Sequence, residues 1–177
     1  TEQELKDKIA KCTHCLDIKF SGENGKRAIV VCGGTGCLSS HSDEIKNRLE
    51  ELIKEHNLED KVTVNQVGCF GFCSQGPFVK IFPEDTLYHM VKVEDCEEII
   101  EKDIMGKEVI DHLLITDPHT HQKVAKQDDL NFYKKQVRIA LHGCGVINPE
   151  DINEGLGYGA FQGLVRALKM DRQEVIN

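Results

Sequence analysis

The sequence predicts an α/β domain in which two helices pack against a mixed four-stranded sheet, with an N-terminal helix and a C-terminal extension. Three observations lead to this fold class. Short β-branched runs alternate with amphipathic stretches of helical spacing. Glycine, proline and other turn residues separate these segments. The chain has 177 residues, 40% of them hydrophobic, which is enough for one core.

The N-terminal segment is predicted to be a helix followed by a turn. The first four residues form a capping-box pattern, and the next apolar residues recur at helical spacing, so we expect a helix over residues 2–11. The sequence SGENGK at 21–26 has the composition of a turn. Cys12 and Cys15 therefore fall after this helix, in a segment that we group as residues 1–26.

Two predicted strands each lead into a pair of cysteines. The run RAIVVC at 27–32 is rich in β-branched residues and predicts a buried strand. The run KVTVNQV at 61–67 places its valines in near alternation and predicts a second strand. Between them, an apolar stripe at helical spacing predicts a helix over 41–56.

A hairpin and a last helix complete the predicted domain. The segments PFVKIF at 77–82 and TLYHMVKV at 86–93 flank a Pro-Glu-Asp turn, which indicates an antiparallel hairpin. Apolar residues on one face, Cys96 among them, predict a helix over 94–104. This order of elements is close to that of thioredoxin, and we assign residues 27–106 to the domain.

The rest of the chain is predicted to extend this domain. Residues 107–132 are mostly polar, and we expect the end of a helix followed by a linker arm. Residues 133–177 contain a strand-like run, a Gly-Cys-Gly turn and a glycine-interrupted amphipathic helix. Because this segment is too short to form a domain by itself, we expect it to dock on something or to begin a larger module.

Composition and charge exclude several classes of function. The net charge is −8 and the basic residues are scattered, so no basic patch is available for nucleic acid. No apolar stretch approaches the roughly 20 residues of a membrane span. Eight cysteines without a secretion signal indicate metal binding or redox chemistry in a reducing compartment, and we therefore expect a cytoplasmic protein.

Four of the cysteines are expected to converge on one site. If the strands at 27–32 and 61–67 lie side by side, the cysteine pairs at their ends emerge at the same edge of the sheet. The glycines around them allow backbone N–H groups to approach sulfur, and Phe70 and Phe72 can shield the site from water. The members of this proposed site are Cys32, Cys37, Cys69 and Cys73.

The four thiolates suit either of two metal centres. Structural zinc commonly uses two residues between paired ligands, whereas the gaps here are four and three residues with abundant glycine. This loop chemistry favours an iron–sulfur cluster. The alternative is a zinc-binding structural or subunit-interaction module, and a third interpretation is that of unrelated buried cysteines at strand ends.

Here the sequence resembles a known family. The segments VVCGGTGC and VGCFGFCSQGP are similar to those of the thioredoxin-like [2Fe-2S] ferredoxins, in which C-x4-C is followed about thirty residues later by C-x3-C. The resemblance implies that each of the four cysteines above is a ligand of a [2Fe-2S] cluster. It also implies electron transfer, one electron at a time.

The C-terminal segment carries a second resemblance. From Leu113 onward it is similar to the junction in the NADH-oxidising flavoprotein subunit of multimeric bacterial hydrogenases, a subunit related to the flavoprotein subunit of complex I. This implies an NAD(P)-linked, electron-bifurcating or related complex, with other iron–sulfur and flavoprotein subunits as partners. FMN and NAD(P) would bind beyond Asn177, so the chain is expected to be an N-terminal fragment whose parent subunit is the oxidoreductase. A homodimer is left open.

Cys12 and Cys15 form another close pair, for which three interpretations stand. A thioredoxin-type redox pair needs a preceding strand and a following helix, and the predicted order differs. The pair can also be half of a second metal site that His142 and Cys144 complete. We favour the third interpretation, cysteines without a ligand role.

Overall fold

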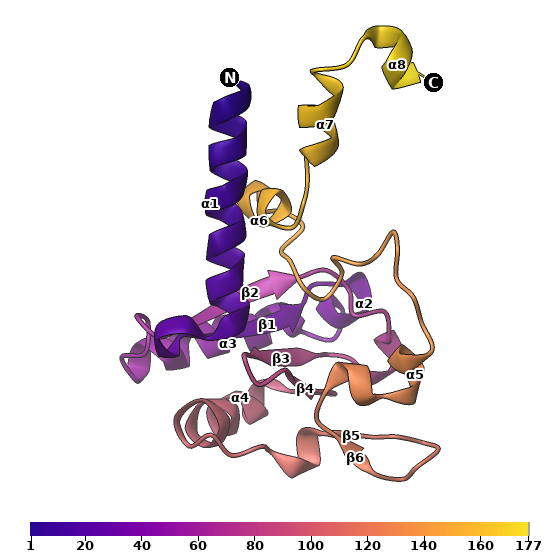
Figure 1. Cartoon of the computed structure of the whole chain (residues 1–177). Helices are drawn as coiled ribbons and strands as arrows, with labels where there is room; N and C mark the ends of the chain where they lie inside the picture. Colours follow the sequence, from indigo (N-terminus) through magenta and orange to yellow (C-terminus); the bar gives the residue numbers. More distant parts are fainter. Residues whose placement is uncertain (177) are drawn as a thin grey trace.

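The computed structural model describes residues 1–176, which adopt the predicted thioredoxin-like α/β fold (Figure 1). The mixed sheet has the strand order β2–β1–β3–β4. β1 runs parallel to β2 and antiparallel to β3, and β4 is antiparallel to β3. The strands are β1 (Arg27–Cys32), β2 (Val62–Val67), β3 (Val79–Phe82) and β4 (Thr86–Tyr88). The mixed sheet and the hairpin are therefore confirmed, although the second hairpin strand ends at Tyr88 and not at residue 93.

Two hydrophobic clusters lie on opposite faces of the sheet. Alternate side chains of β1 point to opposite faces, so Ile29 joins one cluster and Val30 the other. The first cluster is covered by α3 (Ser42–Glu55) and by α4 (Cys96–Glu98) with its continuation. The second includes two of the cysteines together with Phe70 and Phe78. Two cysteines of the predicted metal site are therefore part of a packed core.

The last helix of the domain departs from regular α-helical geometry. The predicted helix over 94–104 begins with a 3-10 turn at Val93–Asp95, passes through α4 and continues as a π-helix over Ile99–Met105. The guanidinium of Arg27 donates to the carbonyl oxygens of Asp103 and Ile104 at 2.6 and 3.0 Å and pairs with the Asp103 carboxylate at 2.6 Å. This buried anchor satisfies the carbonyl groups at the helix end.

The N-terminal helix is longer than predicted. α1 spans Glu2–Ser21 and ends at Gly22, which takes the left-handed conformation (φ 69°). The predicted end at residue 11 was wrong because the apolar face continues through the buried residues Cys12 and Leu16. Cys12 and Cys15 therefore lie inside a helix, on its surface toward α6 (Ile152–Gly157), and not in a loop.

The segment expected to be a linker arm lies against the sheet. It forms the small hairpin of β5 (Ile115–Thr116) and β6 (Lys123–Val124), which is joined to β4 by bridges from Leu114 and Lys126. Leu113, Ile115 and Leu130 are buried in the two clusters. Residues 107–132 therefore contribute to the core. The hairpin and its neighbours lie at one end of the molecule (Figure 1).

The C-terminal segment runs from the sheet toward α1. It contains α5 (Asn131–Lys134), α6, α7 (Gln162–Ala167) and α8 (Arg172–Ile176), and α6 and α7 contact α1 (Figure 1). Lys19 of α1 pairs with Glu154 of α6 at 2.7 Å, and both side chains are largely buried. Residues 1–176 contain no helix long and apolar enough to cross a membrane.

Several shorter elements connect these parts. The helical turn α2 (Thr35–Leu38) follows β1 and was not predicted. The remaining 3-10 turns are Glu23–Gly25, Cys73–Gln75, Asp111–Leu113 and Gln127–Asp129.

Candidate metal centre

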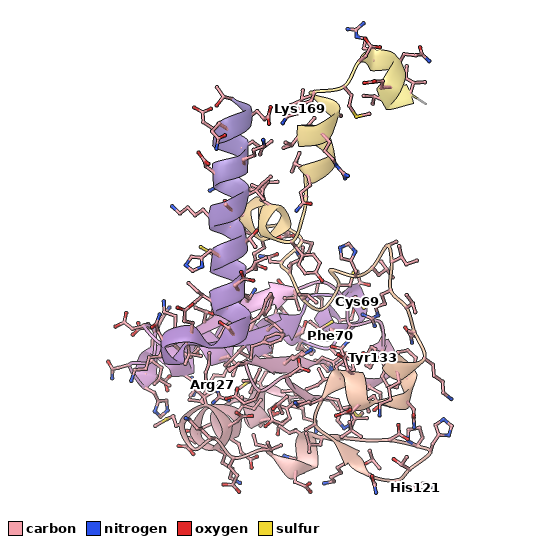
Figure 2. All side chains as sticks on the ribbon, in the orientation of Figure 1. Arg27, Cys69, Phe70, His121, Tyr133 and Lys169 are labelled. Atoms are coloured by element: carbon pink, nitrogen blue, oxygen red, sulfur yellow. The ribbon has the colours of Figure 1, made fainter. Side chains whose placement is uncertain are left out.

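The two cysteine-bearing loops leave the sheet at the same edge. Cys32 at the end of β1 is in register with Val67 at the end of β2, so the chain turns away from both strands at the same level. Cys37 lies in α2, directly after the first of these turns. Cys69 and Cys73 lie in the loop after β2, and Cys69 and Phe70 are labelled at this edge in Figure 2. The expected convergence of the two loops is confirmed.

The four thiol groups form one connected set. The thiols of Cys37 and Cys69 lie close enough to the thiol of Cys32 to lower its pKa. The sulfur atoms of Cys69 and Cys73 are 3.7 Å apart. Two thiolates on one tetrahedral metal, with metal–sulfur bonds of about 2.3 Å, would lie about 3.8 Å apart. The spacing of the second pair thus matches that of two ligands on one metal.

Backbone N–H groups point at these sulfur atoms. The amides of Gly34 and Phe70 lie near Cys32 and lower the pKa of its thiol, and the amide of Phe78 acts in the same direction on Cys37. The amide of Gly71 lies 3.2 Å from the Cys69 sulfur, in a turn where Gly71 has φ 82°. Such donors disperse the negative charge of thiolates and of an iron–sulfur cluster.

Glycine leaves the space that the sulfur atoms occupy. A Cβ atom at Gly34 would lie 3.1 Å from the Cys69 sulfur, and one at Gly76 would lie 2.6 Å from the Cys37 sulfur. Gly36 faces Cys73 at ordinary contact distance, with 3.9 Å from such a Cβ to the sulfur. The loops are thus closed around the thiol groups as tightly as glycine allows.

The two cysteine pairs differ in their exposure. Cys32 and Cys37 are each 1% exposed, whereas Cys69 is half-buried and Cys73 is exposed. Phe70 is fully buried behind the site. Phe72 stacks on Phe132 with ring centroids 4.3 Å apart, and Phe132 is 40% exposed. The site therefore has a buried side and a solvent side that is bordered by aromatic rings.

Close packing of the thiol groups perturbs their ionisation. The hydrogen bond from Cys37 lowers the pKa of Cys32, and the same contact raises the pKa of Cys37. Burial raises the pKa of Cys69, while the Gly71 amide opposes this. One thiol of the buried pair is therefore poised to become a thiolate, the form that binds metal.

The residues present fit a two-iron cluster. The four sulfur atoms lie as two pairs, and a [2Fe-2S] cluster takes its four cysteine ligands in that way. The amide donors and the glycine positions add to this fit.

The residues considered for a second metal site line two different hollows. Cys12 and Cys15 face Asn153 and Glu154 of α6 across a cavity of about 300 Å³. His142 and Cys144 line a different hollow, where His142 stacks on Tyr158 with ring centroids 5.1 Å apart. Cys144 lies against Gly68, since a Cβ atom at Gly68 would be 3.6 Å from the Cys144 sulfur. The structure does not bring Cys12, Cys15, His142 and Cys144 together.

Three residues at the site were missed in the sequence. Gly76 was overlooked although it follows Cys73 closely and precedes a proline, a pattern typical of a tight loop. Tyr133 and Arg138 both reach the carbonyl oxygen of Phe70. Their contribution had no local signal, because they are separated from Phe70 by more than 60 residues in the sequence.

The chain is similar in sequence to known iron–sulfur proteins. Residues 19–103 match the family described as Thioredoxin-like [2Fe-2S] ferredoxin. A "Ferredoxin, 2Fe-2S" of Clostridium pasteurianum is 43% identical over 79 residues, which cover 45% of this chain and 78% of that protein. A solved thioredoxin-like [2Fe-2S] ferredoxin of Aquifex aeolicus is 29% identical, with a TM-score of 0.48 over 52% of this chain and 98% of the other.

Two components of larger enzymes are also similar to the chain. The HndC component of the NADP-reducing hydrogenase of Solidesulfovibrio fructosivorans is 41% identical over 44 residues, which cover 25% of this chain and 9% of that protein. One component of the NADH-quinone oxidoreductase of Rickettsia felis is 32% identical over 82 residues, covering 44% of this chain and 48% of that protein. From the matched residues and from its coverage of the clostridial ferredoxin, this chain belongs to the thioredoxin-like [2Fe-2S] ferredoxin family.

Proposed function

We propose that this protein transfers electrons through a [2Fe-2S] cluster held by Cys32, Cys37, Cys69 and Cys73. The observation that carries the proposal is the meeting of both cysteine pairs at the ends of β1 and β2, within a cradle of glycines and amide donors. A bound [2Fe-2S] cluster would supply one-electron redox chemistry.

The protein's own residues prepare the site for this role. The buried pair, Cys32 and Cys37, anchors the site to the core. The amides of Gly34, Phe70 and Gly71 offset negative charge on sulfur without adding a titratable group. The rings of Phe70 and Phe78, whose centroids are 5.5 Å apart, exclude water from the inner side.

The exposed side of the site is the proposed point of electron exchange. Cys73 is exposed, and the stacked pair of Phe72 and Phe132 lies beside it. A redox partner that docks on this face would come closest to the site at the loop of residues 69–73. Aromatic side chains of this kind are enriched in protein interfaces.

The partners that we propose are subunits of an NAD(P)-linked oxidoreductase complex of the hydrogenase type. Support comes from the similarity to the HndC component of the hydrogenase and to the component of NADH-quinone oxidoreductase. In such a complex the FMN and NAD(P) sites would lie outside the residues of this chain. Eight free cysteines also favour a reducing, cytoplasmic location.

The identity of the metal tests this proposal. We expect anaerobically purified protein to be coloured, to contain iron and acid-labile sulfide, and to give an S = 1/2 EPR signal after reduction. A colourless, zinc-loaded protein without such a signal would show instead a structural or subunit-interaction module. Anomalous scattering at the iron and zinc edges would locate the metal relative to the four cysteines.

A further inference from the structure

The loop of residues 68–71 is capped by a segment that lies outside the family match. Residues 19–103 match the ferredoxin family, yet residues 133–147 lie directly on this loop. The amide of Gly145 donates to the carbonyl of Gly68 at 3.0 Å, and the amide of Gly68 donates to the carbonyl of Ile147 at 3.2 Å. This backbone pairing brings the C-terminal segment to the edge where the cysteines converge.

Two side chains of this segment meet at one carbonyl oxygen. The hydroxyl of Tyr133 donates to the carbonyl of Phe70 at 3.1 Å, and the guanidinium of Arg138 donates to the same oxygen at 2.5 Å. The guanidinium also lies over the Tyr133 ring, 5.0 Å from its centroid. Tyr133 is buried and Arg138 is half-buried, so the pair is partly shielded from solvent. Tyr133 is labelled close to Phe70 and Cys69 in Figure 2.

The carbonyl that Arg138 contacts belongs to the peptide unit that faces Cys69. The peptide between Phe70 and Gly71 has its oxygen on Arg138 and its N–H on the Cys69 sulfur, 3.2 Å away. A cation on the oxygen polarises this peptide and strengthens the donor at the other end. Gly71 makes this orientation accessible with φ 82°, and a Cβ there would lie 3.0 Å from the Arg138 guanidinium.

The charge of Arg138 acts in the same direction. Reduction adds one electron to a centre whose thiolates already make it anionic. A cation one peptide unit away stabilises the reduced form more than the oxidised form, because attraction grows with the negative charge. Partial burial limits the screening of this attraction by salt.

We propose that Arg138 is a positioning residue that fixes the Phe70–Gly71 peptide against Cys69 and raises the reduction potential of the bound cluster. Tyr133 supports the same carbonyl without adding charge. The proposal rests on the proposed function, since it concerns a [2Fe-2S] cluster at the four cysteines. It assigns the C-terminal segment a share in the redox site.

The test is a redox titration of the full chain monitored by EPR. We expect Arg138→Gln to make one-electron reduction about tenfold less favourable, which corresponds to a potential lower by about 59 mV. Arg138→Lys keeps the charge but not the planar donor geometry, and should shift less. Tyr133→Phe should also shift less, because only a neutral donor is removed.

Arg166→Gln is the matched control. It makes the same chemical change at an arginine that lies beside Lys6 and Ile9 of α1. We expect its potential to equal that of the wild type. A fully loaded Arg138→Gln protein with the wild-type potential would overturn the proposal, as would an equal shift in Arg166→Gln.

Hydrogen exchange in metal-free protein separates this proposal from the proposed function. If the wild type bound no iron–sulfur cluster, the proposed function would fail. The effect of Arg138 on the loop of residues 68–76 could still be measured. We expect the amides of residues 68–76 to exchange faster in Arg138→Gln than in the wild type and in Arg166→Gln. Equal exchange in all three proteins would show that Arg138 does not position this loop.

Discussion

At the scale of single residues, the site depends on glycines whose lack of a Cβ atom leaves room for sulfur. A methyl group at Gly76 would collide with the Cys37 sulfur, and one at Gly34 would lie unusually close to the Cys69 sulfur, at 2.6 and 3.1 Å. Gly76 has an extended backbone with φ −77°, which any residue adopts. Its requirement for glycine is therefore steric, and a single methyl group tests it.

Gly76→Ala is predicted to weaken retention of the cluster. The added methyl group would lie 2.6 Å from the Cys37 sulfur, and overpacking of this kind typically costs about 1–3 kcal/mol. We expect less iron per chain than in the wild type after dialysis against a chelator. Gly163→Ala is the control, because a Cβ at Gly163 meets nothing within 4 Å. Equal iron retention in both variants would contradict the steric account.

His89 is predicted to make stability depend on pH. Burial lowers the pKa of His89, so the folded state favours the neutral ring. This contribution is complete above the unfolded pKa of about 6.5 and is lost as the pH falls through the lower folded value. The free energy of unfolding should therefore fall more for the wild type than for His89→Gln between pH 7.5 and pH 5.5. Urea denaturation at both pH values measures this, and parallel pH profiles would show that the ring is not coupled to folding.

At the scale of elements, the contact between α1 and α6 depends on one glycine. A Cβ at Gly157 would lie 2.6 Å from the carbonyl oxygen of Cys12, so the two helices touch through their backbones. The ion pair of Lys19 and Glu154 closes the same contact. Gly155, two residues earlier, has only Ala160 near its Cβ position, at 3.9 Å.

Gly157→Ala is predicted to loosen α6 from α1, whereas Gly155→Ala should not. The backbone of α1 cannot yield as a flexible side chain can, so we expect the free energy of local opening to fall by about 1–3 kcal/mol. Gly155→Ala should leave it unchanged or raise it by up to about 1 kcal/mol, because alanine favours a helix. Hydrogen exchange of α1 measures both effects. Similar exchange in the two variants would mean that the close approach is not important for docking.

The elements also show where sequence patterns predict structure well. The first three strands of the sheet and α3 were predicted within one or two residues because their apolar patterns are local, whereas β4 ends at Tyr88, five residues before its predicted end. The end of α1 was misplaced because Cys12 was considered for its chemistry, whereas in the structure it is a buried member of an apolar face. The hairpin of β5 and β6 escaped notice because its strands have two residues each and owe their place to contacts with β4.

At the scale of the whole molecule, the site combines two regions that are distant in the sequence. The domain supplies the four cysteines, and the C-terminal segment supplies the contacts of Tyr133 and Arg138 to Phe70. The cysteine motif could be recognised because its spacing is fixed by two strand ends. The contacts of Tyr133 and Arg138 could not be recognised, because they arise only when the folded chain brings residues 133–147 back to the loop.

The same view explains how the molecule would work within a complex. The buried pair of cysteines connects the site to the core, and the exposed Cys73 lies beside the stacked rings of Phe72 and Phe132. Electron exchange with a partner would then take place at the edge of the sheet. The cavity beside Cys12 and Cys15 lies elsewhere, between α1 and α6.

The most direct test of the account is the EPR spectrum of the reduced protein in single cysteine variants. Cys32→Ser, Cys37→Ser, Cys69→Ser and Cys73→Ser should each lose or alter the S = 1/2 signal, while the wild type holds about two iron atoms and two sulfides per chain. Cys15→Ser changes an exposed cysteine of α1 and should retain the wild-type spectrum. A wild-type spectrum at full iron occupancy in any of the four variants, or its loss in Cys15→Ser, would contradict the proposed ligand set.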